Sequence, residues 1–282
     1  MSSVPVREAR GPRPVAEIEV IAHRGASEEV PEHTLAAYRQ AIEDGADALE
    51  CDVRLTADGH LVCVHDRRVN RTSNGRGAVS TLELADLAAL DFGSWKDQEV
   101  SGSPDGRQEV PDTEDSERTS VLTLERLLRL VAESPRAVGL AVETKHPTRW
   151  AGRVEERLLE LLGRAQPAFP VRVMSFSARS LQRIHRGAPA VPTVLLMQLL
   201  LPRHRDGRLP RGVDIAGPAI RILRARPEYV ERAHRAGHPV HVWTVDERAD
   251  VELCARLGVD AIITNRPRTV RRWLDEWANR SG

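Results

Sequence analysis

The sequence predicts an α/β fold, a (β/α)₈ TIM barrel, from three observations. Short apolar runs alternate with helical patterns, which is typical of repeated βα units around a parallel sheet. The 282 residues fit one α/β barrel, although two ordinary domains would fit as well. Histidines and carboxylates stand at or near the C-terminal ends of the early apolar runs, which is the end of a parallel strand where active sites usually lie.

Nine apolar runs are candidate strands, whereas the barrel needs eight. They are 18–22, 47–53, 60–65, 138–143, 171–175, 191–196, 213–216, 239–243 and 260–263. An Asp58-Gly59 pair between the second and third runs is a strong hairpin signal. Residues 56–59 are too few for the crossover of about a dozen residues that a parallel neighbour needs. We therefore expect 60–65 to return antiparallel to 47–55, outside the eight barrel strands.

The hairpin also predicts which side chains share a face. If Leu55 pairs with His60, then Glu50 lies opposite His65. Side chains at i and i+2 lie on the same face of a strand, so Glu50, Asp52 and His65 should point the same way. A shift of one residue in the register would undo this arrangement.

Helical patterns follow most of the candidate strands. The predicted helices are 34–44, 80–90, 123–133, 148–162, 178–186, 227–236, 247–257 and 267–277. Gly45, Gly237 and Gly258 follow three of them, as expected for helix C-termini. The helix 80–90 is expected to begin with a capping box over Ser80-Thr81-Leu82-Glu83. Residues 197–212 show no clear helical pattern and predict a long loop over the barrel mouth.

Three segments make up the predicted domain organisation. Residues 1–17 are expected to form a flexible N-terminal arm, and 18–282 a single barrel domain with an insertion at 66–122. Within the insertion, 97–120 is polar, acidic and rich in Ser, Pro and Gly, which favours a mobile surface loop, with a substrate lid as the alternative.

Charge and cysteine content narrow the class of protein. The 41 basic residues balance 41 acidic ones, so nothing global indicates binding to nucleic acid or to an anionic membrane. No apolar run reaches the roughly 18 residues of a transmembrane helix, and the N-terminus shows no secretory signal. Cys51, Cys63 and Cys254 are expected to be buried and unpaired, which favours a reducing, cytoplasmic location.

Carboxylates on two strands suggest a metal site. Glu50 and Asp52 share a strand face with Cα atoms roughly 6.5–7 Å apart, so they can hold one divalent cation. Mg²⁺ and Ca²⁺ prefer such oxygen ligands. An isolated E-x-D pair is more typical of a solvated strand edge, but Glu143 ends the next barrel strand and supplies a third carboxylate.

Basic side chains beside these carboxylates suit an anionic substrate. His23 and His65 could serve as acid and base, although a histidine after a strand is often purely structural. The guanidinium of Arg24 could hold a phosphate through its planar fork. Only two of the 41 basic residues are lysines, Lys96 and Lys145, and Lys145 follows Glu143 by two positions, where it could contact developing negative charge.

Taken together, these residues resemble the glycerophosphodiester phosphodiesterase family. The resemblance extends from residue 18 to about 275 and is carried by His23-Arg24-Gly25, Pro31-Glu32-His33-Thr34, Glu50-Cys51-Asp52-Val53, the hairpin 56–66, Glu143-Thr144-Lys145, Ser175-Phe176, Trp243-Thr244 and residues 258–267. It implies a barrel like that of phosphatidylinositol-specific phospholipase C. In those phospholipases a hydroxyl of the substrate attacks phosphorus and gives a cyclic intermediate, which is a hypothesis for this chain.

The resemblance also implies roles for the site residues. One divalent cation, Mg²⁺ or Ca²⁺ with Mn²⁺ as an alternative, would be held by Glu50, Asp52 and Glu143. His23 and His65 would form the acid–base pair, and Arg24 and Lys145 would bind phosphate.

Four further residues of the matched motifs are candidates with open roles. The Pro-Glu-Asn-Thr motif of the family reads Pro-Glu-His-Thr here, so His33 could alter the surroundings of the metal or admit a different head group. Glu32 is retained and is a candidate neighbour of the metal. Trp243 and Phe176 could stack on the substrate or contact a choline-like head group, and Trp243 could equally be a packing residue.

The sequence therefore predicts metal-dependent hydrolysis of glycerophosphodiesters to an alcohol and sn-glycerol 3-phosphate. One alternative is phospholipase D-like hydrolysis of lysophospholipids or sphingolipids, for which residues 197–201 offer an apolar entrance. A non-catalytic binding barrel is the other alternative, and the complete set of histidines and carboxylates argues against it. The leaving alcohol, the preferred cation, the acid and base assignment and the oligomeric state stay open.

Overall fold

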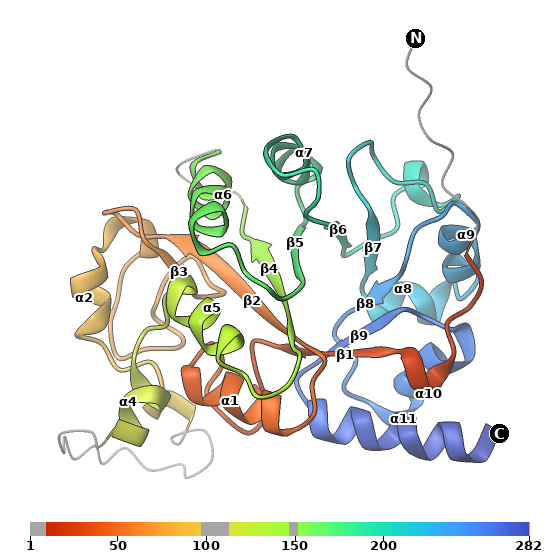
Figure 1. The fold of residues 1–282 in the computed structure, drawn as a ribbon, viewed down its shortest axis with the longest axis horizontal. Helices are drawn as coiled ribbons and strands as arrows, with labels where there is room; N and C mark the ends of the chain where they lie inside the picture. The colour runs from red at the N-terminus through yellow and green to blue at the C-terminus, as the bar shows by residue number, and fades with distance from the viewer. Residues whose placement is uncertain (1–9, 97–112, 147–151, 282) are drawn as a thin grey trace.

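Eight parallel strands form the wall of a barrel in the computed structural model, which describes residues 10–96, 113–146 and 152–281 (Figure 1). Their order around the wall is β7-β6-β5-β4-β2-β1-β9-β8, and parallel bridges from Ala216 to Val240 and from Ala219 to Trp243 join its two edges. The strands are β1 (Glu19–His23), β2 (Ala48–Leu55), β4 (Gly139–Thr144), β5 (Val171–Ser175), β6 (Thr193–Met197), β7 (Ile215–Pro218), β8 (His241–Val242) and β9 (Ala261–Thr264). The predicted (β/α)₈ barrel is confirmed.

The third strand, β3 (Leu61–Cys63), is the predicted antiparallel return strand beside β2. Its register differs from the prediction, because Leu55 pairs with Leu61 and not with His60. Thr56 and His60 close the turn instead: the Thr56 N–H donates to the His60 carbonyl at 2.9 Å, and the His60 N–H donates to Thr56 Oγ1 at 2.8 Å. The prediction of the hairpin is confirmed, and the predicted register is wrong by one residue.

Alternate side chains of each barrel strand point inward or outward. In β1, Ile21 belongs to the barrel interior, whereas Val20 and Ala22 pack in the larger core between strands and helices. Because both faces are buried, the strands read as nearly continuous apolar runs. The interior cluster consists of Ile21, Ala48, Ala141, Met174, Val194, Leu196, Ile215, Ala261 and Ile263. Residues two positions further along β1, β2 and β4 therefore point into the barrel mouth.

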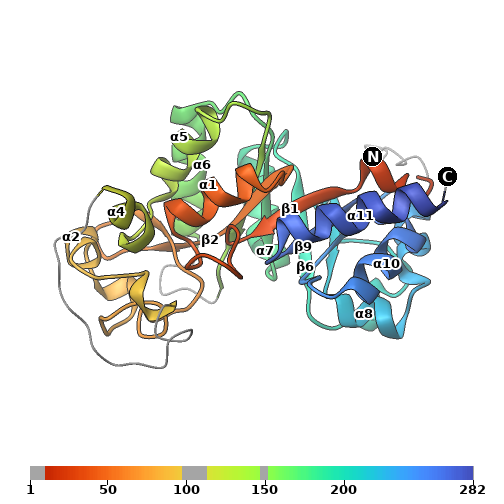
Figure 2. The ribbon, with the colours of Figure 1, turned by 90° about the horizontal axis from the view of Figure 1, so that it is seen from below.

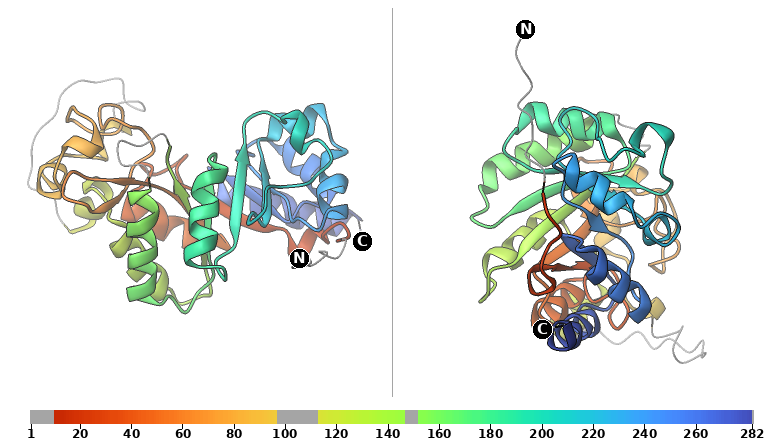
Figure 3. Two further views of the ribbon diagram at one scale, coloured as in Figure 1. Left: turned by 90° about the horizontal axis from the view of Figure 1, so that it is seen from above. Right: turned by 90° about the vertical axis from the view of Figure 1, so that its right-hand side faces the viewer.

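Helices surround the strands on the outside (Figure 3). They are α1 (Leu35–Glu43), α2 (Leu84–Ala88), α4 (Thr113–Thr119), α5 (Leu124–Ala132), α6 (Arg153–Ala165), α7 (Ala178–Gly187), α8 (Ile220–Ala225), α9 (Tyr229–Arg235), α10 (Arg248–Leu257) and α11 (Pro267–Ser281). Within the described residues no helix is both long enough and apolar enough to cross a membrane.

Two helix predictions need correction. The segment 80–90 holds a 3₁₀ helix (Val79–Thr81) followed by α2, whose capping box joins Glu83 to Asp86 and not Ser80 to Glu83. The extended backbone of Leu82 separates the two short helices. Helix α8 was not predicted, because its apolar residues follow β7 with no clear starting signal. Met197 ends β6, and 198–212 contain no regular element except a 3₁₀ turn at Pro202–His204, so the expected loop is confirmed.

The insertion lies at one end of the molecule, with α2 and α4 far from α8 and α10 (Figures 1 and 2). Its part 97–112, where the mobile loop or lid was expected, lies outside the described residues. Residues 113–119 belong to the same expected loop and are helical, as α4. The end of that segment was therefore predicted wrongly.

The described part of the expected N-terminal arm, residues 10–17, contacts the barrel. The Arg10 N–H donates to the His234 carbonyl at 2.9 Å, and the Arg13 N–H donates to the Gly258 carbonyl at 3.0 Å. A 3₁₀ turn at Val15–Glu17 follows and contacts α11. Residues 10–17 therefore contact the barrel, and the flexibility of the arm stays a prediction.

Candidate active site

A cavity of about 240 Å³ opens at the C-terminal ends of the barrel strands. One side of it, here called the polar side, is lined by His23, Arg24, Glu50, His65, Glu143 and Lys145. The apolar side is lined by Met174, Phe176, Leu196, Trp243 and Ile263. The polar side comes from the adjacent strands β1, β2 and β4 and from the residues that follow them and β3.

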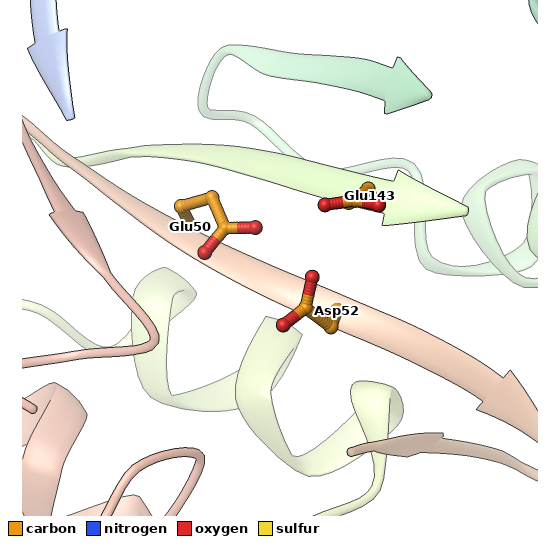
Figure 4. A group of neighbouring side chains, drawn as sticks. All are labelled: Glu50, Asp52 and Glu143. Atoms are coloured by element: carbon orange, nitrogen blue, oxygen red, sulfur yellow. The ribbon is translucent and has the colours of Figure 1, made fainter. Parts of the chain in front are cut away.

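Three carboxylates converge on the polar side (Figure 4). Glu50 and Asp52 project from β2 and Glu143 from β4, and Asp52 is the register partner of Glu143. One oxygen of each lies within 4.8 Å of the others, and all three residues are buried. These three side chains lie together as predicted. The reason is that side chains two positions apart on a strand, or in register on neighbouring parallel strands, point to the same side of the sheet.

Two cations partly neutralise the cluster. The Nζ atom of Lys145 lies 2.8 Å from Asp52 Oδ1 and 2.8 Å from Glu143 Oε2, and Arg24 Nε lies 3.1 Å from Asp52 Oδ2. Burial alone would raise the pKa of Asp52, but Lys145 and His33 outweigh it and hold that pKa well below its ordinary value. Asp52 is therefore ionised.

In the other two carboxyl groups, Glu50 and Glu143, the ionised form is disfavoured. Burial, followed by the charges of Asp52 and Glu143, raises the pKa of Glu50 well above its ordinary value. Burial, followed by the charge of Asp52, raises the pKa of Glu143 to about 8. Because the negative charge of these buried carboxyl groups is not fully compensated, a further cation would stabilise their ionised forms. The oxygen donor set and the buried Asp52 Oδ1, which makes no well-directed hydrogen bond, fit a hard divalent ion.

His23 presents its Nε2 atom as a hydrogen-bond acceptor. Its Nδ1 lies 2.7 Å from Asn265 Oδ1, and the Asn265 amide is held by Asp246, with Nδ2 2.6 Å from Asp246 Oδ2. An amide oxygen can only accept, so His23 Nδ1 carries the hydrogen and Nε2 carries the lone pair. Burial, and secondarily the charge of Arg24, lowers the pKa of His23 to about 3, so the ring is neutral.

His65 has a different partner. Its Nδ1 donates to Asp66 Oδ1 at 2.7 Å, and its carbonyl accepts from Arg54 Nε at 3.0 Å. The ring lines the cavity although the predicted register is wrong, because β3 ends at Cys63 and His65 is carried by the segment after the strand. Burial lowers the pKa of His65, and the charge of Asp52 and the hydrogen bond to Asp66 oppose that change.

Arg24 is held by the backbone as well as by charge. Its φ of 60° is in the left-handed region, its N–H donates to Glu50 Oε2 at 3.1 Å, and its Nη1 donates to Glu32 Oε1 at 3.1 Å. The next residue, Gly25, has a φ of 86°, and a Cβ there would lie 2.7 Å from Ala37. The glycine is required for the sharp turn that brings Arg24 over β2.

Glu32 and His33 lie in different places. Glu32 is not part of the described carboxylate cluster and pairs with Arg24 and with Arg71 Nη2, the latter at 2.8 Å. His33 is buried, and its Nε2 lies 2.9 Å from Asp52 Oδ2 and its Nδ1 2.8 Å from the Tyr38 hydroxyl. The residue that replaces the family's asparagine thus touches a candidate metal ligand directly, whereas Glu32 does not join the cluster.

The aromatic pair lies on the apolar side. The rings of Phe176 and Trp243 pack edge to face, with centroids 5.4 Å apart. The indole N–H of Trp243 donates to the Gly217 carbonyl at 2.7 Å, so this donor is already engaged by the backbone. Phe176, Leu199 and Leu201 are the large apolar side chains exposed to solvent among the described residues.

Several partners of these residues were not among the predicted site residues. Asp66 and Asn265 stand inside motifs that carry the family resemblance, so a signal for them was present. Arg54 and Arg71 have no comparable signal, because arginine makes up most of the basic residues of the chain. Only their contacts identify them.

Comparisons with known proteins identify the family. The sequence model of the glycerophosphoryl diester phosphodiesterase family matches residues 23–269. The probable glycerophosphodiester phosphodiesterase 1 of Mycobacterium tuberculosis is 47% identical over 266 residues, which are 91% of this chain and 92% of that protein. The glycerophosphodiester phosphodiesterase of Caldanaerobacter subterraneus is 34% identical and covers 89% of this chain and 95% of its own length.

Solved structures show the same fold. The glycerophosphodiester phosphodiesterase of Agrobacterium tumefaciens superposes with a TM-score of 0.72 at 25% identity, covering 90% of this chain and 99% of that one. A phosphodiesterase of Oleispira antarctica in complex with sn-glycerol-3-phosphate superposes with a TM-score of 0.74 at 24% identity, covering 91% of this chain and 96% of that one. The resemblance predicted from the motifs is confirmed: the chain belongs to the glycerophosphoryl diester phosphodiesterase family.

Proposed function

We propose that the protein hydrolyses glycerophosphodiesters to an alcohol and sn-glycerol 3-phosphate in the cavity at the barrel mouth. The observation that carries the proposal is the convergence of two carboxylates, two imidazoles and two cationic side chains on one cavity, with the buried carboxylate of Asp52 beside them. Membership of the family and the names of the relatives support this choice of substrate.

Glu50, Asp52 and Glu143 would hold one divalent cation, Mg²⁺ or Ca²⁺ with Mn²⁺ as an alternative. When bound, such an ion polarises phosphoryl oxygens and neutralises charge in the transition state. The raised pKa values of Glu50 and Glu143 support the assignment, because a bound cation would favour the ionised form of both carboxyls against burial and against the charge of Asp52. Mg²⁺ and Ca²⁺ suit the all-oxygen donor set equally well.

Arg24 and Lys145 would bind the phosphate. Both line the cavity beside the carboxylates, and each is already ordered by an ion pair to Asp52. Ordering the two cations before the substrate arrives reduces the entropy that binding must overcome. Their charge would also stabilise the negative charge that builds up on the phosphoryl oxygens.

His23 and His65 would move the protons. Both donate through Nδ1, to Asn265 and Asp66 respectively, so each has Nε2 available for a proton. The carboxylate of Asp66 stabilises an imidazolium, whereas the neutral amide of Asn265 does not. The geometry therefore favours His65 as the protonated ring that gives its proton to the leaving oxygen. His23 is the neutral ring whose Nε2 takes the proton of the attacking hydroxyl or water.

A second substrate class is favoured by one observation. Phe176, which lines the apolar side of the cavity, is exposed to solvent, and so are Leu199 and Leu201, which follow the cavity residue Gln198 in the sequence; an acyl chain would require such apolar surface. Hydrolysis of lysophospholipids or sphingolipids is therefore the second candidate. A cytoplasmic location is also proposed, and the three buried unpaired cysteines suit a reducing compartment.

A substrate panel tests both candidates. Release of glycerol 3-phosphate from glycerophosphocholine, glycerophosphoethanolamine and glycerophosphoinositol is measured with Mg²⁺, Ca²⁺ or Mn²⁺ and with chelator. Release of choline from lysophosphatidylcholine in detergent is measured beside it. We expect cation-dependent turnover of the soluble diesters and its loss in Glu50→Gln, but not in the control Glu125→Gln, which alters an exposed residue of α5. Turnover that survives the chelator, or full activity of Glu50→Gln, would refute the proposal, and activity on the lysolipid alone would favour the second candidate.

A further inference from the structure

Arg71 of the insertion makes three hydrogen bonds to two carboxylates on different segments. Its Nη1 and Nη2 donate to Glu32 Oε2 and Oε1 at 2.9 and 2.8 Å, and its Nε donates to Asp66 Oδ2 at 2.7 Å. The pair with Glu32 is the bidentate arrangement that a planar guanidinium allows and an ammonium does not.

Each of these carboxylates has a second partner, and that partner lines the cavity. Glu32 Oε1 also accepts from Arg24 Nη1 at 3.1 Å, and Asp66 Oδ1 accepts from His65 Nδ1 at 2.7 Å. The hydrogen bonds therefore run without a break from Arg24 through Glu32, Arg71 and Asp66 to His65. This chain joins the proposed phosphate ligand to the imidazole proposed to change charge.

The segment that carries Arg71 is fixed by its own packing. Val69 is fully buried, its N–H donates to the Gly77 carbonyl at 3.0 Å, and its carbonyl accepts from Ser73 Oγ at 2.8 Å. Thr72, next to Arg71, is also buried. A small apolar core separate from the barrel supports this segment, made of Val62, Val64, Val69, Val79, Leu87, Phe92 and Val121.

Arg71 itself does not line the cavity, and its side chain is 43% exposed, on the outer side of Glu32 and Asp66. It is placed to hold other residues and not to touch the substrate. Burial alone would raise the pKa of Glu32, but the hydrogen bonds from Arg71 and the charge of Arg24 lower it to about 2, so this link stays ionised.

We propose that Arg71 is a positioning residue that fixes the orientation of Arg24 through Glu32 and of His65 through Asp66, so that phosphate binding and proton transfer are aligned by one side chain of the insertion. The inference rests on the proposed function. It assigns to the insertion a role in the geometry of the site.

Kinetics of matched variants test the inference. Arg71→Met is compared with Arg68→Met, which removes an exposed arginine of the same segment whose side chain contacts only Asn70 among the hydrogen bonds of the described residues. Loss of a residue that orients a catalytic group typically costs roughly 10- to 100-fold. We expect Arg71→Met to lower kcat by about that factor and also to raise KM, with Arg68→Met unchanged.

The two branches of the chain separate these effects. Glu32→Gln should mainly raise KM, through Arg24, and Asp66→Asn should mainly lower kcat, through His65. Arg71→Lys keeps the charge but loses the fork, so it should stay well below wild type. Wild-type kcat and KM in Arg71→Met, or complete rescue by Arg71→Lys, would overturn the proposal. If Arg71→Met does not fold, Arg71→Lys and Asp66→Asn decide the question.

A spectroscopic measurement is independent of turnover. In ¹⁵N-labelled protein the His65 ring, assigned with His65→Ala, should show Nδ1 protonated and Nε2 unprotonated, and Arg71→Met should shift or broaden these signals while Arg68→Met leaves them in place. An inactive wild type would refute the proposed function, yet these spectra would still decide whether Arg71 orients His65. Unchanged His65 signals in Arg71→Met contradict the inference.

Discussion

The two sides of the cavity are held in different ways. On the polar side the charged groups are paired, as Lys145 is with Asp52 and Glu143 and His65 is with Asp66. On the apolar side, Phe176 and Trp243 pack against each other, and the Trp243 N–H is bonded to the backbone. Paired charges fix side-chain positions in a way that apolar contact does not. We therefore expect substitutions to lower activity more on the polar side than on the apolar side.

The largest effect is expected on the polar side, at His65. Replacing His65 with alanine should lower kcat by roughly 10²- to 10⁴-fold, as for loss of a general acid or base, with a smaller change in KM. Steady-state kinetics on glycerophosphocholine measure it. The matched control is His60→Ala, which removes a half-exposed histidine of the same hairpin whose nearest carboxylate, on Asp58, is 3.7 Å away. A His65→Ala enzyme within threefold of wild type would contradict the division between the two sides.

A second effect concerns stability and pH. Burial, followed by the charge of Asp52, raises the pKa of Glu143 from 4.5 to about 8. A carboxyl whose pKa is raised by folding stabilises the fold below its unfolded pKa, and that contribution is lost as pH rises through the folded value. Without divalent cation, the free energy of unfolding should therefore fall between pH 5 and pH 8 by more than about 1.4 kcal/mol, the equivalent of one pKa unit.

Denaturant unfolding at several pH values, with chelator and with Mg²⁺ or Ca²⁺, checks this expectation. The added cation should flatten the pH dependence because it compensates the same charge. Glu143→Gln should also flatten it, whereas Glu125→Gln, on the exposed face of α5, should not. If the cation-free protein is equally stable at pH 5 and pH 8, the acidic cluster is better compensated than its contacts indicate.

The smallest effect is expected on the apolar side. Phe176→Ala removes apolar surface that lines the cavity and the ring that packs against Trp243. We expect the substrate to lose about 1 kcal/mol of apolar contact, which corresponds to roughly a fivefold rise in KM. Leu199→Ser should leave the soluble diesters unaffected and weaken activity only on a lysophospholipid, because Leu199 is exposed beyond the cavity lining. A loss in Phe176→Ala as large as in His65→Ala would show that the apolar side takes part in the reaction.

Elements with a regular sequence pattern could be predicted from the sequence, and elements without one could not. The strands could be predicted because a barrel strand is apolar on both faces. The carboxylate cluster could be predicted because Glu50, Asp52 and Glu143 occupy inward-pointing positions on neighbouring strands. The short helix α8 and the helical residues 113–119 were missed, because neither has a long apolar period or a clear cap. Their positions depend on packing against the rest of the chain.

The hairpin register shows where local reasoning stops. The Asp58-Gly59 signal indicates a turn, but hydrogen bonds between Thr56 and His60 decide which residues pair, and they shift β3 by one position. His65 reaches the cavity nevertheless, because it lies after the strand, where alternation no longer applies. The predicted location of His65 is therefore correct, although the register from which it was predicted is wrong.

By itself the sequence determined a parallel barrel and an inward-facing set of acidic residues at its mouth, since the two-residue period of a strand assigns each side chain to a face. Only the tertiary structure decided which loops hold that set in place. Glu32 meets Arg71 across 39 positions, and His23 meets Asn265 across 242. Loops have no period, so contacts of this kind follow from how the completed barrel brings distant segments together.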